Sequence, residues 1–270
     1  MVHTDEGAFR IELDSRPLKA LAKRVDSSGH GFTLSRLGLK AIHGVAESLV
    51  PCEIVAPPLQ ESGLTRLDVL VDRLREMGAR GTHDGLFYAF GVHFNPELKD
   101  ITASAVRDHL RAFSLLRPWI KSRFDTDFSR ELSLFIQPHA GDYIQLVLDT
   151  DYRPSMEQLI DDYIEANPSR NRDLDMLPMF AHVDEKRVHR ALDDDVKINP
   201  RPTFHYRLPN ADVSDPDWSV TREWQSWRAV ERLARDTNRL AQANRMWNRR
   251  HAEGSFDQER WIRDVEALMR

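Results

Sequence analysis

Acidic side chains alternate with apolar residues in two strand-like segments of the sequence. Glu12 and Asp14 alternate with apolar residues in the first segment, and Glu53 lies between apolar neighbours in the second. Successive side chains of a strand point to opposite faces, so these carboxylates share a polar face. Carboxylates two positions apart repel each other, and a bound divalent cation removes that repulsion. Hard oxygen donors suit Mg²⁺ or Mn²⁺, so these acids are candidate metal ligands.

Imidazole and guanidinium groups follow the same alternation in two later segments. His93 and Asn95 share one face of a candidate strand, and His205 and Arg207 lie opposite large apolar side chains in another. Arginine binds phosphate and carboxylate groups through two parallel hydrogen bonds. Three further arginines are candidates for that role: Arg10, Arg170 and Arg172. Carboxylate-held metal together with several arginines is the equipment of phosphoryl transfer from a nucleotide.

A solvated sheet face is the alternative explanation of this pattern. Alternating charges on a strand often face water, and Arg170 and Arg172 could pair locally with Asp173 and Asp175. The alternation places Cys52 on the apolar side of its strand. We therefore expect this single cysteine to be a buried and unreactive thiol.

The elements that must position these groups change in character along the chain. The sequence begins with strand-like alternation, predicts helices over 64–77 and 101–119, and predicts strands over 132–136 and 143–148. Ser155 and Gln158 resemble a capping box before a further helix that stops at Asn167. From Trp218 the pattern is helical, with a break at Gly254. We expect one α+β domain over 1–270, with 218–270 a helical C-terminal portion.

Composition excludes several classes of protein. A net charge of −5 disfavours general nucleic-acid binding, which needs a concentrated basic surface. The apolar runs are too short to cross a bilayer, so no membrane partner is expected. The first residues lack the basic and apolar regions of a signal peptide, and one cysteine excludes an internal disulfide. A cytoplasmic location is the expectation.

The order and spacing of these segments resemble the bacterial amidoligase family, which is similar in fold to glutamine synthetase and glutamate–cysteine ligase. The resemblance reaches to about Trp227, with a helix over 64–77 between the second and third of its segments. These segments are Phe9–Asp14, Glu53–Leu59, Phe90–Glu97, Asn167–Pro178 and Arg201–Pro209. Two residues depart from the family pattern. Asp14 shortens the second acid of the first strand, and His205 stands where the ligases usually carry a glutamate.

The resemblance implies a twisted, mainly antiparallel sheet packed by helices, whose concave face holds ATP and two or more Mg²⁺ or Mn²⁺ ions. By position it assigns Glu12, Asp14 and Glu53 to metal, and His93 to metal or nucleotide phosphate. His205 is retained as a candidate metal ligand, although imidazole brings no negative charge. Arg207 and Arg172 are assigned to catalysis. Asn95, Arg170 and Arg10 are assigned to ATP.

The function that the resemblance implies is an ATP-dependent carboxylate–amine ligase, which forms an amide through an acyl phosphate. The carboxylate and the amine could belong to small molecules or to peptides, and a partner amidotransferase as the source of ammonia stays open. Two alternatives use the same scaffold. One is a small-molecule phosphotransferase, and the other is a non-catalytic or regulatory nucleotide-binding module.

Overall fold

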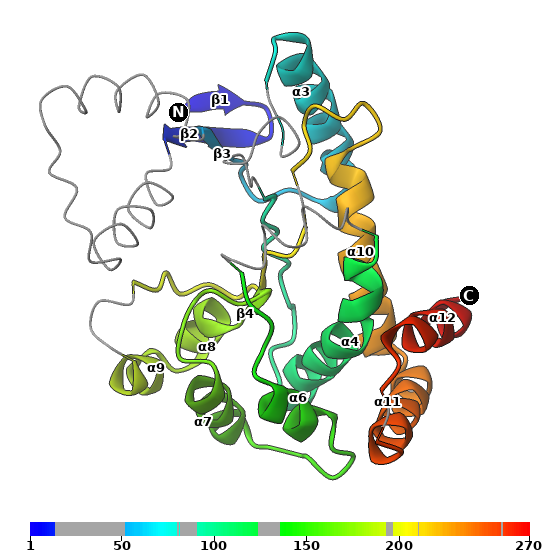
Figure 1. Ribbon diagram of the computed structural model, residues 1–270. Coiled ribbons are helices and arrows are strands. Elements are labelled where there is room, and N and C mark those ends of the chain that lie inside the picture. Colours follow the sequence, from blue (N-terminus) through cyan, green and yellow to red (C-terminus); the bar gives the residue numbers. More distant parts are fainter. Residues whose placement is uncertain are drawn as a thin grey trace, which may run out of the picture. The chain divides into compact units, whose positions relative to one another are not determined.

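The computed structural model describes residues 1–13, 52–79, 81, 91–123, 136–192, 197–209, 211–254 and 256–270. These residues form two compact units, which we describe separately. The first comprises Met1–Phe90 and Asp212–Val220, and the second comprises Gly91–Ala211 and Thr221–Arg270. The expected α+β class is confirmed, because both helices and antiparallel strands are present (Figure 1). A single domain and one continuous concave sheet stay predictions. Asp14 and most of the expected strand 132–136 lie outside the described residues.

The first unit contains a three-stranded antiparallel sheet in the order β1-β2-β3. Its strands are β1 (Val2–Thr4), β2 (Gly7–Leu13) and β3 (Cys52–Val55). Gly7 follows the tight turn between β1 and β2 with φ of +131°, where a Cβ atom would lie 2.9 Å from Pro57. Only glycine adopts this backbone conformation without strain. The turn therefore fixes the register of β1 on β2.

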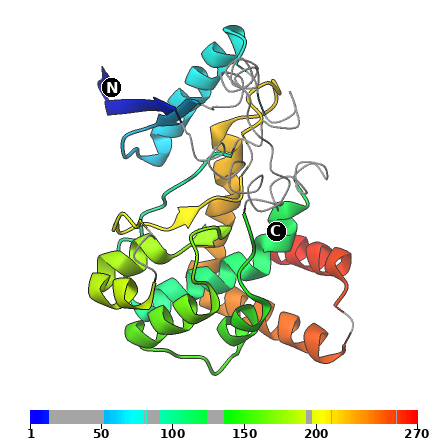
Figure 2. The ribbon, with the colours of Figure 1, turned by 60° about the vertical axis from the view of Figure 1, so that its left-hand side comes forward.

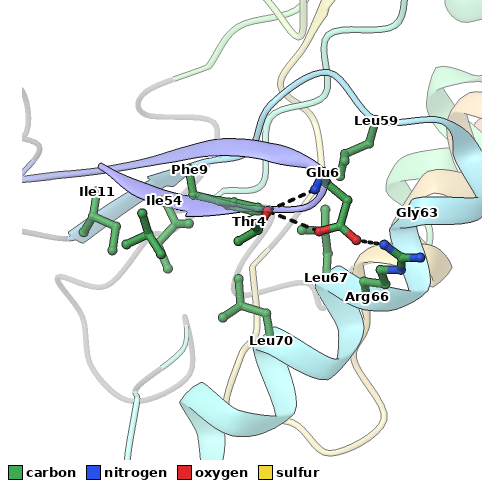
Figure 3. Close-up of a pocket in the computed structure, with 11 residues that line it drawn as sticks. Thr4, Glu6, Phe9, Ile11, Ile54, Leu59, Gly63, Arg66, Leu67 and Leu70 are labelled. Atoms are coloured by element: carbon green, nitrogen blue, oxygen red, sulfur yellow. Dashed lines mark hydrogen bonds and ion pairs between the residues drawn. The ribbon is translucent and has the colours of Figure 1, made fainter.

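A helix packs against this sheet as the sequence predicts. The 3₁₀ turn η1 (Glu61–Gly63) leads into α3 (Leu64–Glu76), and the chain turns away at Gly78, whose φ is +83°. Leu67 and Leu70 of α3 face the sheet across a cavity (Figure 3). The apolar spacing that predicted the helix is thus the spacing that lines one wall of this cavity.

The second unit is mainly helical and is built around the long helix α4 (Ala103–Lys121) (Figure 1). Thr102 caps its N-terminus by accepting a hydrogen bond from the Ala105 amide at 3.2 Å. One stripe of apolar residues on this helix is buried: Val106, Leu110, Phe113 and Leu116. Pro118 lies inside the last turns and does not end the helix. Helices α6 (Gly141–Leu148) and α7 (Met156–Ala166) pack on α4. Helix α9 (Glu185–Ala191) packs on α7 and on α8 (Leu177–Val183).

The strand expected over 143–148 is wrong, because these residues form helix α6. Tyr143, Val147 and Leu148 are buried at helical spacing, while Ile144 and Leu146 are less covered. A short apolar run has the same composition in a buried strand and in a buried helix, so periodicity did not distinguish them. The capping prediction for α7 is confirmed, since Ser155 Oγ accepts from the Gln158 amide at 3.2 Å.

The strand expected around His205 is only two residues long, and the described residues around His93 form isolated bridges and no strand. Two-residue strands β4 (Leu174–Asp175) and β5 (His205–Tyr206) pair antiparallel, and Phe94 joins them through two hydrogen bonds with Tyr206, of 3.0 and 2.9 Å. The ladder is short because prolines flank it and donate no backbone hydrogen bond. These prolines are Pro96, Pro202 and Pro209.

The helical C-terminal portion is confirmed. It consists of α10 (Val220–Arg235), α11 (Thr237–Ala252) and α12 (Gln258–Met269). Asp236 and Asp257 cap α11 and α12, and Gly254 lies at the expected break with φ of +74°. Both α11 and α12 pack on α4 (Figure 2). Within the described part of the chain, no helix is both long and apolar enough to cross a bilayer.

Candidate functional site

The first unit places two carboxylates directly opposite each other. In the register of β2 and β3, Glu12 pairs with Glu53, while Ile11 pairs with Ile54. Directly paired residues of an antiparallel ladder share one face, with Cβ atoms roughly 5 Å apart. Arg10 lies two residues from Glu12 on this face, and its Nε contacts Glu12 Oε1 at 2.9 Å. The structure thus brings together three of the residues that the sequence singles out.

This acidic pair fits a divalent cation. Like charges directly opposite each other destabilise a sheet, and Arg10 is about half exposed, so water screens its pairing with Glu12. A cation between the carboxylates would remove the repulsion, and oxygen donors match Mg²⁺ or Mn²⁺. Within the described ranges no three His, Cys, Asp or Glu residues are close enough to hold a metal. The third acid of the sequence pattern, Asp14, falls outside those ranges.

The opposite face of the same sheet is apolar. With α3 it encloses a cavity of about 300 Å³ (Figure 3). Phe9, Ile11 and Ile54 line it from the sheet, and an ion pair of Glu6 with Arg66 lies at one end. The alternation of polar and apolar faces is therefore as the sequence predicts. The expectation for Cys52 is wrong, because its side chain is exposed: it begins β3, and the lining of the cavity stops at Ile54.

The second unit gathers several polar residues around His205. Asn95 Oδ1 lies 2.9 Å from His205 Nδ1, and Arg201 Nη2 lies 3.3 Å from the same nitrogen. The ring of His93 meets the ring of His205 edge-on, with centroids 5.2 Å apart. On the neighbouring strand β4, Asp175 pairs directly with His205. The short strand β5 thus presents His205 to residues from three other segments.

Two arginines are fixed beside this histidine by the backbone and by Asp175. Arg170 Nε donates to Asp175 Oδ2 at 3.1 Å, and its Nη1 donates to the Lys197 carbonyl at 2.8 Å. Arg207 Nη1 donates to the carbonyl of Arg170. The Asp175 side chain is fully buried and also accepts from the Leu177 amide at 3.1 Å. The local pairing of Arg170 with Asp175 therefore exists, but it is buried and not solvated.

Burial is the main reason that the His205 ring is neutral. Burial lowers the pKa of His205 well below its usual value, and the positive charge of His93, Arg207, Arg201 and Arg170 lowers it further. Burial raises the pKa of Asp175, and the nearby guanidinium of Arg170 opposes that rise. We call the set His93, Asn95, Arg170, Arg201, His205 and Arg207 the arginine–histidine cluster. Its excess of positive charge suits an anion.

The structure departs from the sequence-based site in three places. Arg172 lies outside the cluster contacts: its Nη1 donates to the Pro138 carbonyl at 2.7 Å, and its Nε is buried without a hydrogen-bond partner among the described residues. Arg201 and Asp175 belong to the site but were not predicted. Arg201 is the first residue of the segment Arg201–Pro209, which resembles the amidoligase family, and this resemblance could have identified it as a site residue. The sequence indicated Asp175 only as a possible local partner of Arg170 and Arg172.

This α+β chain therefore carries two distinct groups of polar residues. The sheet carboxylates suit a cation, and the arginine–histidine cluster suits an anion. Comparison with protein families assigns the chain: the family model described as "Putative amidoligase enzyme" matches residues 2–229. The chain therefore belongs to this amidoligase family. The matched range contains both groups of residues and ends inside α10. Searches of curated proteins and of solved structures found no match.

Proposed function

We propose that this protein is an ATP-dependent ligase that joins a carboxylate to an amine through an acyl phosphate. Family membership supports an amide-forming enzyme. The observation that carries the finer proposal is the direct opposition of Glu12 and Glu53 on one face of the sheet. Directly opposite carboxylates repel each other, and a divalent cation between them would remove that repulsion.

Glu12 and Glu53 would hold Mg²⁺ or Mn²⁺, with Asp14 as a third proposed ligand. When bound, the cation would neutralise charge on the ATP phosphates. Arg10, which contacts Glu12, is positioned to reach a phosphate oxygen near the same carboxylate. His93 and Asn95 are proposed to contact the nucleotide from the arginine–histidine cluster.

The proposed reaction has two steps. An oxygen of the substrate carboxylate attacks the γ-phosphorus of ATP, and ADP leaves. The amine nitrogen then attacks the acyl carbon, phosphate leaves, and the nitrogen loses a proton. Arg207 and Arg170 would hold the transferred phosphoryl group, because guanidinium groups bind its oxygens in pairs. Arg172 is proposed as a further substrate contact. Phosphoryl transfer mainly demands stabilisation of charged states, and cations and guanidinium groups both supply it.

The substrates are proposed only as classes. The carboxylate and the amine belong to small molecules or peptides, with ammonia from a partner amidotransferase as one source. Nothing in the composition favours nucleic acid as a partner, and we propose a cytoplasmic location.

His205 gives a reason to keep a second candidate. A neutral imidazole replaces the glutamate that the ligases usually carry, so one metal ligand of the family pattern is missing. A nucleotide-binding module without catalysis, or a phosphotransferase with fewer metal ions, is compatible with that loss. Retention of Glu12 and Glu53 in direct opposition favours the ligase.

An acyl-phosphate trap tests the proposal. The protein is incubated with ATP, Mg²⁺, pooled amino acids and short peptides, and hydroxylamine, and hydroxamate and ADP are measured. We expect hydroxamate from the wild type and none from Glu12→Gln or Glu53→Gln. Asp5→Asn, an exposed acid in the turn of the same unit, is the matched control and should behave as wild type. A stable phosphorylated product without hydroxamate would indicate the phosphotransferase instead.

A further inference from the structure

We propose that the apolar cavity between the three-stranded sheet and α3 binds a free α-amino acid with an apolar side chain. The cavity measures about 300 Å³, at the small end of the range for ligand sites, and all the residues that line it belong to the first unit. It lies on the face of the sheet opposite Glu12 and Glu53. The proposal therefore goes beyond the proposed function, and it does not depend on the binding of metal or ATP.

The walls of the cavity suit an apolar side chain. Phe9, Ile11 and Ile54 form the wall on the sheet, and Leu67 and Leu70 form the opposite wall on α3 (Figure 3). Ile11 and Ile54 are 50% and 37% exposed. Large apolar side chains that stay accessible around a pocket are typical of a binding site, because a ligand that covers them removes apolar surface from water.

One end of the cavity carries one positive and one negative group. Arg66 on α3 forms an ion pair with Glu6 in the turn between β1 and β2 (Figure 3). Thr4 holds this turn, because its Oγ1 accepts from the Glu6 amide at 3.3 Å and donates to the Gly7 carbonyl at 3.0 Å. Within the described part of the chain, neither charged group has a second ion-pair partner. The Arg66 side chain is 67% exposed, so this ion pair is weak and can be exchanged at small cost.

The balance of these two charges favours a zwitterion. A ligand with only a carboxylate would displace Glu6 from Arg66 and would leave the Glu6 side chain, which is 23% exposed, without a cation. A ligand with only an ammonium group would leave Arg66 without its anion. An amino acid brings both groups on one carbon: its carboxylate accepts hydrogen bonds from Arg66, and its ammonium group donates to Glu6. Two ion pairs then replace one, and the apolar side chain enters the cavity.

Calorimetry of the full chain in EDTA tests the class of ligand. The probes are L-leucine and L-phenylalanine, each compared with two analogues that lack one charge. Isocaproate and hydrocinnamate lack the ammonium group of leucine and phenylalanine, and isoamylamine and phenethylamine lack the carboxylate. We expect the wild type to bind at least one of the two amino acids. Both analogues of that amino acid should bind at least about tenfold more weakly, because each leaves one charged group of the cavity unpaired.

Substitutions then locate the bound amino acid. Arg66→Met and Glu6→Gln should each weaken its binding at least about tenfold, since each removes one of the two charges. Arg73→Met is the matched control, because Arg73 is an exposed arginine of the same helix that does not line the cavity. Glu53→Gln should also bind the amino acid like the wild type, since Glu53 lies on the other face of the sheet. Circular dichroism checks the folding of each variant, and Glu6→Gln keeps the test decisive if Arg66→Met does not fold.

Three results would overturn the inference: no binding of either amino acid to the wild type, an analogue that binds as tightly as its parent amino acid, or unchanged affinity in Arg66→Met. Loss of binding in Glu53→Gln alone would place the amino acid at the acidic pair and would overturn it as well. These measurements contain neither metal nor ATP. Their failure therefore leaves the proposed ligase untouched, and absence of hydroxamate in the acyl-phosphate trap counts against the ligase alone.

Discussion

Two carboxylates on one sheet face are the residue-scale feature with the clearest energetic consequence. Glu12 and Glu53 are directly paired, and Arg10 Nε contacts Glu12 at 2.9 Å. Repulsion between directly opposite like charges costs an antiparallel sheet up to about 1 kcal/mol. Under the proposed function, a divalent cation between the two carboxylates would offset this repulsion.

Replacing Glu53 with glutamine should therefore stabilise the metal-free protein. We expect the free energy of unfolding to rise by about 0.5 kcal/mol, because one of two repelling charges is removed. Addition of Mg²⁺ should raise the melting temperature of the wild type but not of Glu53→Gln. Thermal unfolding with EDTA and with Mg²⁺ measures both effects, with Asp5→Asn as control. Destabilisation of metal-free Glu53→Gln would show that the pair is not strained.

A second carboxyl group with an unusual environment is Glu223 on α10. Burial raises the pKa of Glu223 to about 7, although Arg222 and Arg123 oppose the rise. The unfolded chain ionises this group near its ordinary value of 4.5. Between these values the folded state holds the extra proton, so the contribution of Glu223 to stability falls as the pH rises from 4.5 to 7.

Glu223→Gln should remove this pH dependence. We expect the variant to gain up to ~3 kcal/mol relative to wild type between pH 4.5 and pH 8, because glutamine never ionises. Buried His139 acts in the other direction, since burial lowers its pKa to about 4 and its contribution to stability grows up to the ordinary value of 6.5. The test is therefore the difference between the two proteins in urea unfolding across pH. An equal profile for both would contradict the environment assigned to Glu223.

At the scale of elements, one arginine ties α3 to a segment far away in the sequence but within the same unit. Arg75 Nε donates to the Val213 carbonyl at 2.8 Å, and Nη2 donates to the Asp215 carbonyl at 2.9 Å. Gly81 lies beside this segment so closely that a Cβ atom would come within 2.6 Å of the Val213 nitrogen. The first unit therefore depends on contacts that bridge about 140 residues of sequence.

Arg75→Met should destabilise the protein by about 2 kcal/mol, because it leaves part-buried carbonyl groups without their donor. Arg73→Met is the matched control: Arg73 lies on the same helix, is exposed, and pairs only with Glu76 among the residues described. We expect a change below about 0.5 kcal/mol for the control. Urea unfolding measures both. Equal effects of the two substitutions would contradict the role of Arg75.

The elements that could be predicted were those with local signals. Helix α4 and helix α7 have apolar residues at helical spacing and N-terminal capping side chains at Thr102 and Ser155, so their N-termini and buried faces follow from sequence. Helix α6 and the short strands β4 and β5 depend on tertiary contacts. The apolar run of α6 is compatible with a strand or a helix, and β5 pairs with residues at least 30 positions away.

At the scale of the whole molecule, helices continue beyond the residues that the family model matches. It ends at residue 229, yet α11 and α12 beyond it pack on α4. Trp261 of α12 is fully buried, and its Nε1 donates to the Leu115 carbonyl of α4 at 2.9 Å. The C-terminal helices therefore belong to the core of the second unit. They pack on α4, which lies inside the range that the family model matches.

Trp261→Ala should destabilise the protein by about 3–5 kcal/mol, because it empties a large buried volume and removes this hydrogen bond. Trp261→Phe should cost less, since it keeps most of the apolar volume. Glu266→Ala, an exposed position on the same helix, is the control. Denaturant unfolding ranks the three variants. A change in the free energy of unfolding below about 1 kcal/mol for Trp261→Ala would show that α12 does not belong to the core.

The sequence predicts which face of a strand each candidate site residue lies on, but it does not predict which residues are paired across the strands. Alternation alone placed Glu12 and Glu53 on a polar face, since side-chain direction in a strand is local. Their direct opposition depends on the register of β2 against β3, across more than 35 intervening residues. The pairing of Asp175 with His205 likewise depends on strand register, in this case that of β4 against β5.

Calorimetry of Mg²⁺·ATP binding to the intact protein tests the central claim most directly, because it needs no knowledge of the carboxylate or the amine. We predict that wild-type protein and Asp5→Asn bind the nucleotide only when Mg²⁺ or Mn²⁺ is present. Glu53→Gln should bind it at least about tenfold more weakly, as expected for loss of a charged ligand. Absence of binding to the wild type, or equal binding to Glu53→Gln, would contradict the assignment of the acidic pair and with it the proposed ligase.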